Sequence, residues 1–248
     1  MPNNSHAAVS AGKTPAAPAR FPGLRMAADH LVRNALRLEN ALYEYRLGIS
    51  THGLVNWTPG DWSQNEHLYY FATSYRRIFR ILDALHLGPA DTFIDLGCGK
   101  GRVACCASRY PVGEVIGIED VAGLCAAAEK NLRNLSGKRA PTRILCGKAE
   151  GFDYTTGTVI YMFHAFGPKT LGAVLSQLDK GLRLNPRHVT LVYVNPIHEH
   201  VLQETKWLKL YERWPATRYL GSEVMHPVSF WRLRDFHSRF AARAADLT

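Results

Sequence analysis

The stretch that most constrains the fold of this chain is residues 91–102, which reads DTFIDLGCGKGR. Its residues 92–96 are a short apolar run of the kind that forms a buried strand. Gly97, Gly99 and Gly101 follow at once, and the residues after them predict a helix. Glycine permits a sharp turn with positive φ and leaves no side chain between the loop and a ligand. A strand, a glycine turn and a helix together predict a nucleotide-type binding crevice at the carboxyl edge of a parallel sheet.

The glycine spacing separates two classes of ligand. The dinucleotide fingerprint is G-x-G-x-x-G, but its sixth position here holds Arg102. The spacing is instead G-x-G-x-G, with Asp95 two residues before the first glycine. This stretch resembles motif I of the class I S-adenosylmethionine-dependent methyltransferases, and the chain looks close to uncharacterised bacterial members. By the order of predicted elements, the resemblance extends over about residues 68–233. It implies S-adenosyl-L-methionine as the cofactor.

A second acid supports the resemblance. Residues 114–119 predict the next strand, which ends in Glu119 and is followed by Asp120. A carboxylate at this place can accept hydrogen bonds from both ribose hydroxyls, and we assign that role to Glu119. We expect Asp120 to be the N-cap of a helix over residues 121–134.

The resemblance implies a cofactor site at the ends of the first four strands. The expected cofactor-binding residues are Asp95, Gly97, Cys98, Gly99, Gly101, Glu119, Asp120, Ala149, Glu150 and Phe163. Residues 143–146 predict the third strand, and Gly147 follows it. Relatives usually carry an acid directly after this glycine, near the adenine amino group. Lys148 stands there in this chain. Glu150 or the backbone of Ala149 would then have to recognise adenine.

The acceptor side is expected at the end of a fourth strand, residues 158–163, before His164-Ala-Phe-Gly. Methyltransferases that act on the amino groups of DNA bases or on glutamine amides carry Asn or Asp with two prolines and an aromatic residue there. Only the aromatic residue remains here, so the motif does not indicate such an acceptor. We take His164 as the candidate catalytic base, because imidazole titrates near neutrality. The alternative is that His164 only shapes the pocket. The candidate substrate-binding residues are Tyr69, Tyr75, Phe166 and Asn195.

Five alternating strand and helix units are followed by two alternating apolar runs, residues 207–214 and 228–233, which predict an antiparallel pair. We therefore predict an α/β fold: a three-layer, Rossmann-like methyltransferase sandwich whose seven-strand sheet is mostly parallel, with strand seven antiparallel. Helices are expected over residues 28–46 and 65–87. The first carries an apolar stripe at helical spacing: Leu31, Ala35, Leu38, Leu42 and Tyr45.

The predicted organisation has four parts. They are a disordered tail (1–25), a helical N-terminal cover (26–90), the cofactor-binding methyltransferase domain (91–236) and a C-terminal tail (237–248). The composition of the first tail, rich in Ala, Pro, Ser and Asn, does not support a packed core.

Composition and charge limit the kinds of partner that we expect for this chain. No apolar run approaches ~20 residues, so we expect no membrane span. The formal net charge is +9, but the basic residues are scattered and no nucleic-acid motif accompanies them. We therefore favour a solvated surface over a nucleic-acid partner. His198 and His200 form an H-x-H pair with no third ligand near, so no metal site is expected. The oligomeric state is left open.

The five cysteines contain no C-x-x-C spacing, and we expect buried free thiols in a cytoplasmic protein. The predicted function is methyl transfer from S-adenosylmethionine to a protein or small-molecule acceptor. One alternative is an inactive binding or regulatory module of the same fold. A less favoured alternative is an NAD-type Rossmann enzyme, against which the terminal strand pair and the sixth motif position argue.

Overall fold

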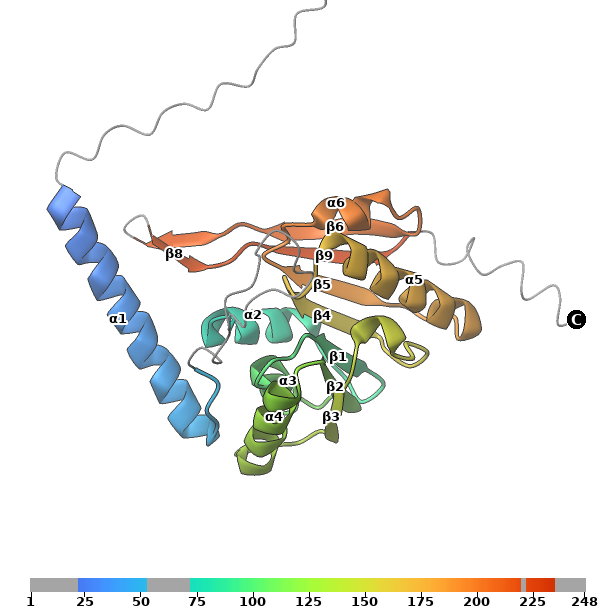
Figure 1. The fold of residues 1–248 in the computed structure, drawn as a ribbon, viewed down its shortest axis with the longest axis horizontal. Coiled ribbons are helices and arrows are strands. Elements are labelled where there is room, and N and C mark those ends of the chain that lie inside the picture. Colours follow the sequence, from blue (N-terminus) through green and yellow to red (C-terminus); the bar gives the residue numbers. More distant parts are fainter. Residues whose placement is uncertain (1–21, 53–71, 220–221, 235–248) are drawn as a thin grey trace, which may run out of the picture.

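The computed structural model describes residues 22–52, 72–219 and 222–234. Its centre is a seven-stranded sheet with the order β3-β2-β1-β4-β5-β9-β6 (Figure 1). The strands are β1 Thr92–Leu96, β2 Glu114–Glu119, β3 Thr142–Cys146, β4 Val159–Phe163, β5 Thr190–Val194, β6 Leu208–Trp214 and β9 Val228–Leu233. Strands β1 to β5 are parallel, and β9 runs antiparallel to both of its neighbours. The predicted sheet, with its seventh strand antiparallel, is confirmed.

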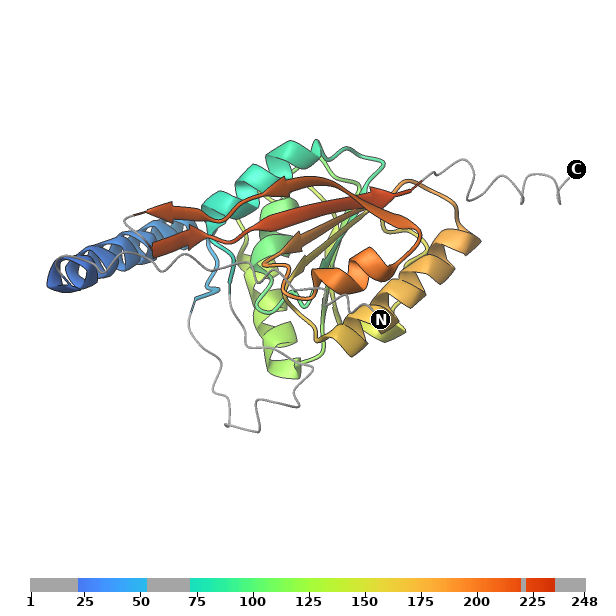
Figure 2. The same cartoon turned by 90° about the horizontal axis from the view of Figure 1, so that it is seen from above.

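Helices cover both faces of the sheet (Figure 2). The first face carries α2 Tyr75–Leu85, α3 Arg102–Ala107 and α4 Ala122–Asn134, and the second carries η1 Ala149–Gly151, α5 Pro168–Leu184 and α6 Glu199–Glu204. Because side chains alternate along a strand, neighbouring residues enter different cores. Phe93 packs in the first core and Ile94 in the second, and both are fully buried.

Two elements extend to one side of the sheet in Figure 1: α1 Pro22–Leu47 and a hairpin of β7 Thr217–Tyr219 and β8 Ser222–Met225. The sequence did not indicate this hairpin. It continues beyond β6 and returns to β9, and β8 contacts α1. Helix α1 begins inside the range predicted as the first tail, and it ends before Gly48, which adopts φ +73°.

The second predicted helix begins later than expected. Residues 53–71, which include Tyr69, lie outside the described residues. Residues 72–74 are not helical. Helix α2 begins at Tyr75, because the side chain of Ser74 accepts a hydrogen bond from the backbone N–H of Arg77 at 3.3 Å. Within the described ranges, no helix is both long and apolar enough to cross a bilayer.

Candidate functional site

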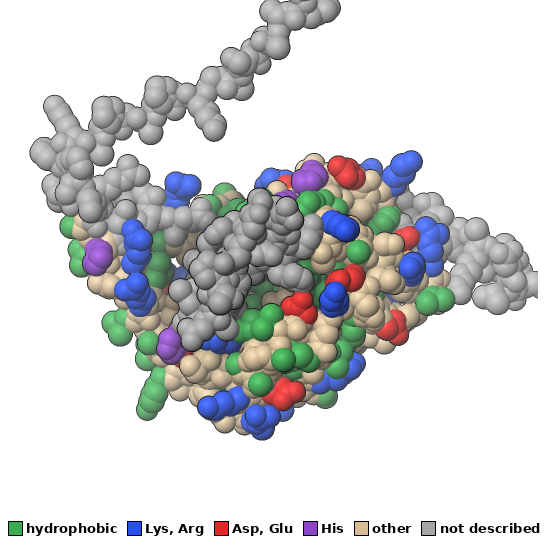
Figure 3. Space-filling model, viewed as in Figure 1, with side chains coloured by type: hydrophobic (Ala, Val, Ile, Leu, Met, Phe, Trp, Pro, Cys, Tyr) green, Lys and Arg blue, Asp and Glu red, His purple; other side chains and the backbone are tan. Residues whose placement is uncertain are grey.

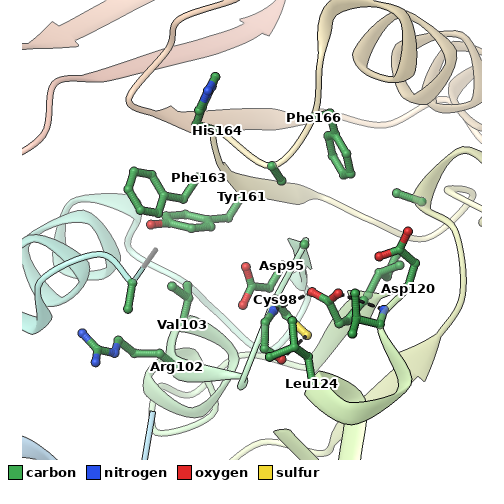
Figure 4. A pocket seen from close by; sticks show the side chains of 18 of the residues that line it. Asp95, Cys98, Arg102, Val103, Asp120, Leu124, Tyr161, Phe163, His164 and Phe166 are labelled. Atoms are coloured by element: carbon green, nitrogen blue, oxygen red, sulfur yellow. Dashed lines mark hydrogen bonds between the residues drawn. The ribbon is translucent and has the colours of Figure 1, made fainter. Parts of the chain in front are cut away.

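A pocket lies at the carboxyl ends of the central strands, where the strand order reverses between β1 and β4 (Figure 4). This is the position at which open α/β sheets bind ligands. Predicted residues that line it are Asp95, Gly97, Cys98, Gly99, Glu119, Asp120, Ala149, Glu150, Phe163, His164 and Phe166. The topology therefore brings together side chains from four strand ends that are far apart in the sequence.

The glycine turn between β1 and α3 has the conformation that its composition indicated. Gly97, Gly99 and Gly101 have φ angles of +65°, +56° and +77°. These values lie in the left-handed region that side chains disfavour. At Gly97 a Cβ atom would also stand 2.6 Å from the Cβ of Ala165, the second residue after β4. Glycine there lets the turn and the end of β4 approach closely, which closes one side of the pocket.

Glu119, at the end of β2, is held by backbone donors. One carboxylate oxygen accepts the N–H of Gly99 at 2.9 Å and the other accepts the N–H of Val121 at 3.0 Å. A carboxylate offers about four lone-pair positions, so these two bonds leave acceptor capacity for a ligand. The pKa of Glu119 is raised: burial is the largest cause, and the two backbone hydrogen bonds oppose it.

Asp120 does not cap the following helix, so that expectation was wrong. Helix α4 begins at Ala122, and its N-cap is Val121, which makes no side-chain capping bond. Glu119 instead accepts the hydrogen bond from the Val121 N–H. The acid that was assigned to the ligand therefore also orders the helix start, while Asp120 lies exposed at the pocket.

Asp95, on β1, points into the pocket beside Cys98 (Figure 4). Its carboxylate accepts the backbone N–H of Ala104, in the first turn of α3, at 3.1 Å. Burial raises the pKa of Asp95 to about 7, and the nearby charge of Glu119 adds to this, while the Ala104 hydrogen bond opposes it. The protonation of Asp95 therefore changes near neutral pH.

The charge of the pocket is one-sided. Four carboxyl groups line it, from Asp95, Glu119, Asp120 and Glu150, against one guanidinium, that of Arg102. The hydrogen bonds of the Arg102 side chain go to groups other than these four carboxyl groups. It donates to the Thr51 hydroxyl at 2.7 Å, to the Thr73 carbonyl at 3.0 Å and to the Glu44 carboxylate at 3.2 Å. The pocket therefore favours a cationic ligand over an anionic one.

The bonds of Arg102 connect α1 to the glycine turn. Glu44, on α1, is 5% exposed and accepts bonds from the Thr51 N–H and hydroxyl at 2.9 and 2.6 Å. It also contacts the ring of His52. The Arg102 guanidinium stacks 4.4 Å from the centre of the Tyr75 ring. This buried network (Glu44, Thr51, Tyr75 and Arg102) fixes α1 on the glycine turn.

The residues that follow strand β3 form another part of the pocket lining. Ala149 and Glu150 line the pocket, whereas Lys148 is exposed and does not. Cys146, the last residue of β3, is disulfide-bonded to Cys125 on α4, with 5.8 Å between the Cα atoms. The expectation of free thiols was therefore wrong for these two cysteines. Cys98, Cys105 and Cys106 are free and buried.

At the end of β4, aromatic side chains form the opposite wall. Tyr161 and Phe163 lie on the same face of the strand, and the Tyr161 hydroxyl pairs with that of Thr73 at 3.1 Å. The imidazole of His164 points away from Asp95 (Figure 4), and its ring centre lies 5.3 Å from that of His198. Burial, and to a smaller extent His198, lower the pKa of His164, which keeps the ring neutral at neutral pH.

The backbone around His164 is strained. His164 and Asn195 follow β4 and β5 directly and have φ angles of +39° and +51°. Such angles in residues other than glycine cost of order 1–3 kcal/mol and cluster at functional sites. The His164 N–H donates to the Val194 carbonyl at 3.2 Å, which ties the two strand ends together. Within the described part of the chain, the enclosed Nδ1 of His164 has no hydrogen-bond partner.

Three predicted residues of the described chain do not line the pocket. Gly101 is the N-cap of α3, Tyr75 belongs to the buried network, and Asn195 lies beyond β5. Sequence reasoning missed Tyr161 and Thr73. The two-residue spacing between Tyr161 and Phe163 on a predicted strand was the available signal for Tyr161. No local signal pointed to Thr73, which reaches the pocket through the chain before α2.

Residues 73–206, more than half of the chain, match the family model described as protein-L-isoaspartate(D-aspartate) O-methyltransferase (PCMT). The chain belongs to this family. The matched range contains the pocket residues from Thr73 to Phe166, so the family assignment rests on the part of the chain that builds the site. No curated protein sequence matches the chain.

Solved methyltransferase structures are similar to the chain. A dimethyladenosine transferase from Plasmodium falciparum has a TM-score of 0.52 and 14% identity, covering 69% of this chain and 66% of that one. An RNA methyltransferase from Salinibacter ruber, in complex with S-adenosyl-L-homocysteine, has a TM-score of 0.47 and 18% identity, covering 66% and 95%. Identities this low establish the fold alone, which is that of the class I methyltransferases.

Proposed function

We propose that this protein transfers a methyl group from S-adenosylmethionine to a protein or small-molecule acceptor. The observation that carries the proposal is the acidic pocket at the glycine turn. S-adenosylmethionine has a net positive charge, because its sulfonium adds to a zwitterionic amino acid. Four carboxyl groups around the pocket complement that charge. The pyrophosphate of a dinucleotide would meet the same groups with repulsion, which argues against an NAD-type enzyme.

The residues present fit the cofactor. The left-handed glycine turn leaves its backbone open to a ligand. The Glu119 carboxylate lines the pocket and can accept hydrogen bonds from ribose hydroxyls. Ile118, Leu124 and Phe166 offer apolar surface to an adenine ring. Adenine recognition falls to Ala149 and Glu150, because Lys148 lies outside the pocket.

The chain's own residues must position the acceptor. S-adenosylmethionine supplies a methyl group on a sulfonium whose departure needs no acid, so the protein's task is alignment of the acceptor. Tyr161 and Phe163 form a flat wall on the acceptor side, which restricts the directions of approach. The role of His164 as a base stays a proposal, and it requires the neutral ring to turn from His198 toward the pocket.

The family description suggests which acceptor to test first. It names a carboxyl oxygen of an altered aspartate in a protein. A carboxylate is already ionised at neutral pH and needs no base. This acceptor therefore agrees with a pocket in which the imidazole of His164 points away from Asp95. An amine or hydroxyl acceptor would instead depend on a base such as His164.

The deciding experiment combines a measurement of ligand binding with an assay of methyl transfer. Calorimetry should show binding of S-adenosylmethionine and S-adenosylhomocysteine and none of NAD. Transfer of labelled methyl groups is then measured on peptides with an isoaspartyl carboxyl group, on their aspartyl counterparts and on small-molecule pools. Binding without transfer to any acceptor would favour an inactive module. Binding of NAD alone would overturn the proposal.

His164 is tested in the same assay once an acceptor is found. If it is the base, His164→Ala lowers turnover by roughly a hundredfold while cofactor affinity stays normal. If it only shapes the wall, His164→Asn remains active. The pH–rate profile then keeps its limb near neutrality.

A further inference from the structure

The outward face of α1 is apolar. The side chains of Leu31, Leu38, Leu42 and Tyr45 are 71%, 73%, 48% and 86% exposed. The other side of the helix faces the domain, where Val32, Glu44 and Leu47 are buried. Hydrophobic side chains are visible along the outer edge of α1 in Figure 3. The apolar stripe that predicted this helix therefore lies in solvent, while a buried carboxylate anchors the helix to the domain.

The spacing of the stripe is that of a helix–helix seam. Leu31, Ala35, Leu38, Leu42 and Tyr45, here called the α1 seam, are separated alternately by four and three residues. A repeat of 3.5 residues keeps one edge of a helix turned toward a partner helix, as in coiled coils. The same spacing continues upstream in the sequence at Leu24 and Ala28, so it extends over three heptads.

The area of the seam suits a dimer. The exposed parts of its side chains add up to on the order of 500 Å² per copy, at the upper end of the largest apolar patch on a typical monomer. Two such faces would bury about 1,000 Å² together, the lower bound for a specific interface. The flanking residues Asn34 and Ala41 are uncharged. Two copies of this basic chain can therefore approach along that flank without like-charge repulsion.

We propose that the α1 seam pairs with the same seam of a second copy of the chain, in antiparallel orientation. In heptad terms, Ala35 and Leu42 hold position a, and Leu31, Leu38 and Tyr45 hold position d. Antiparallel pairing brings each residue at position a opposite a partner residue at position d. Ala35 then meets the partner's Leu38, and Leu31 meets the partner's Leu42. The small side chain of Ala35 is then matched by a large leucine of the partner. A parallel pair would place Ala35 against its own copy between two leucine layers, and the resulting void costs packing energy.

This pairing is isologous, because each seam contributes both members of every contact, and it closes as a two-fold dimer. It does not depend on the proposed methyl transfer. The pocket opens at the carboxyl ends of the strands, whereas the α1 seam lies on the opposite side of α1 from the domain. Loss of the dimer should therefore leave cofactor binding intact.

The mass of the full-length chain in solution tests the proposal. Sedimentation velocity over a concentration series should show a dimer for the wild type. Leu38→Glu should weaken the dimer by at least a hundredfold, because it buries an unpaired charge in the seam. His30→Glu is the matched control: it introduces the same carboxylate at an exposed position of α1 outside the seam, and it should remain dimeric.

Three results would overturn the proposal. One is a wild type that is monomeric at all concentrations and whose melting temperature is unchanged by Leu38→Glu, since the seam would then stand free. Another is a monomeric wild type that Leu38→Glu destabilises, since other residues of the same chain would then cover the seam. The third is a dimer that Leu38→Glu leaves intact, because it would form through another face.

Cross-linking tests the orientation. The native cysteines are buried or disulfide-bonded, so any cross-link formed must come from the thiol introduced on the α1 seam. In an antiparallel dimer, the Ala35→Cys and Leu38→Cys variants should cross-link when mixed, and neither should cross-link efficiently by itself. Efficient cross-linking of each variant alone would show a parallel pair and overturn the antiparallel arrangement.

Discussion

At the residue scale, Glu119 combines two tasks. Its carboxylate accepts the N–H groups of Gly99 and Val121, which ties the glycine turn to the start of α4. Glu119 also lines the pocket. A residue used in this way is both part of the architecture and a ligand contact, so a test must separate the two effects.

We expect Glu119→Gln to weaken S-adenosylmethionine binding by about tenfold to a hundredfold, because a charge-assisted contact is worth ~1.5–3 kcal/mol. The Gln amide would also place its NH₂ group against the backbone N–H of Gly99 or Val121, so that two donors face each other. Calorimetry measures the affinity, and a thermal melt reports the structural part. Glu129→Gln, an exposed change on α4, is the control. Unchanged affinity in Glu119→Gln would remove this residue from the site.

Asp95 makes both the stability of the fold and the affinity for a charged ligand depend on pH. Its pKa in the folded chain is about 7 against an ordinary value of 3.8, so between these values the folded chain holds a proton that the unfolded chain releases. The associated stability is therefore present below about pH 4 and is lost as the pH rises through 7. A cationic ligand favours the carboxylate, so its affinity should rise over the same range.

We expect binding of S-adenosylmethionine near pH 6.5 to release a proton from Asp95, and binding of S-adenosylhomocysteine, which lacks the sulfonium charge, to release less. Calorimetry in two buffers of different ionisation enthalpy measures the difference. Asp95→Asn should abolish it. Equal proton release with both ligands would show that Asp95 does not sense the sulfonium charge.

At the element scale, α1 is attached to the glycine turn through Glu44. The pKa of Glu44 is lowered: burial alone would raise it, but bonds from Thr51 and His52 and the charge of Arg102 outweigh burial. Its stabilising contribution is therefore present at neutral pH and is lost as the pH falls through the lowered pKa. Hydrogen bonds from Lys100 to the His52 carbonyl and from Asn131 to the Ser50 carbonyl extend the attachment.

Glu44→Gln should reduce the free energy of unfolding by about 3 kcal/mol, because it leaves the buried Arg102 guanidinium without its counter-charge. Urea unfolding measures this. Glu39→Gln is the control. Glu39 is on the same helix as Glu44, and the change removes its partly exposed pair with Arg76 of α2, which should cost at most ~1 kcal/mol. Equal losses in the two variants would mean that the Glu44 network does not hold α1 in place.

The disulfide between Cys125 and Cys146 joins α4 to β3. Thiol titration should find no reactive thiol in the folded chain, since burial raises the pKa of Cys98, Cys105 and Cys106. Denaturation should expose three thiols, and reduction of the denatured chain should raise the count to five. Five thiols before reduction would show that the pair is not bonded.

At the scale of the whole molecule, two truncations separate the tail from the cover. Deletion of residues 1–20 should leave the melting temperature, cofactor affinity and oligomeric state unchanged, since their composition does not support a core. Deletion of residues 1–47 removes Glu44 and the α1 seam, so it should destabilise the fold and abolish the proposed dimer. A lower melting temperature after the shorter deletion would contradict this division.

Local sequence determined the centre of the molecule. The bounds of β1 and β2 match the predicted runs, because a continuous apolar stretch followed by glycine or an acid leaves few alternatives. The three glycines predicted their own positive φ angles. Asp95 and Glu119 could be placed in the pocket because the carboxyl ends of neighbouring parallel strands meet at one edge of a sheet.

Other features depended on contacts between distant segments, which local patterns do not contain. The same helical spacing fits a buried or an exposed stripe. The burial of Glu44 against Arg102, 58 residues away, together with Val32 and Leu47, leaves Leu31, Leu38 and Leu42 facing outward. Cys125 and Cys146 pair because α4 packs beside β3. His164 has a strained, positive φ angle, and its imidazole lies near that of His198. Periodicity locates side chains along an element, but the packing of elements decides what each side chain faces.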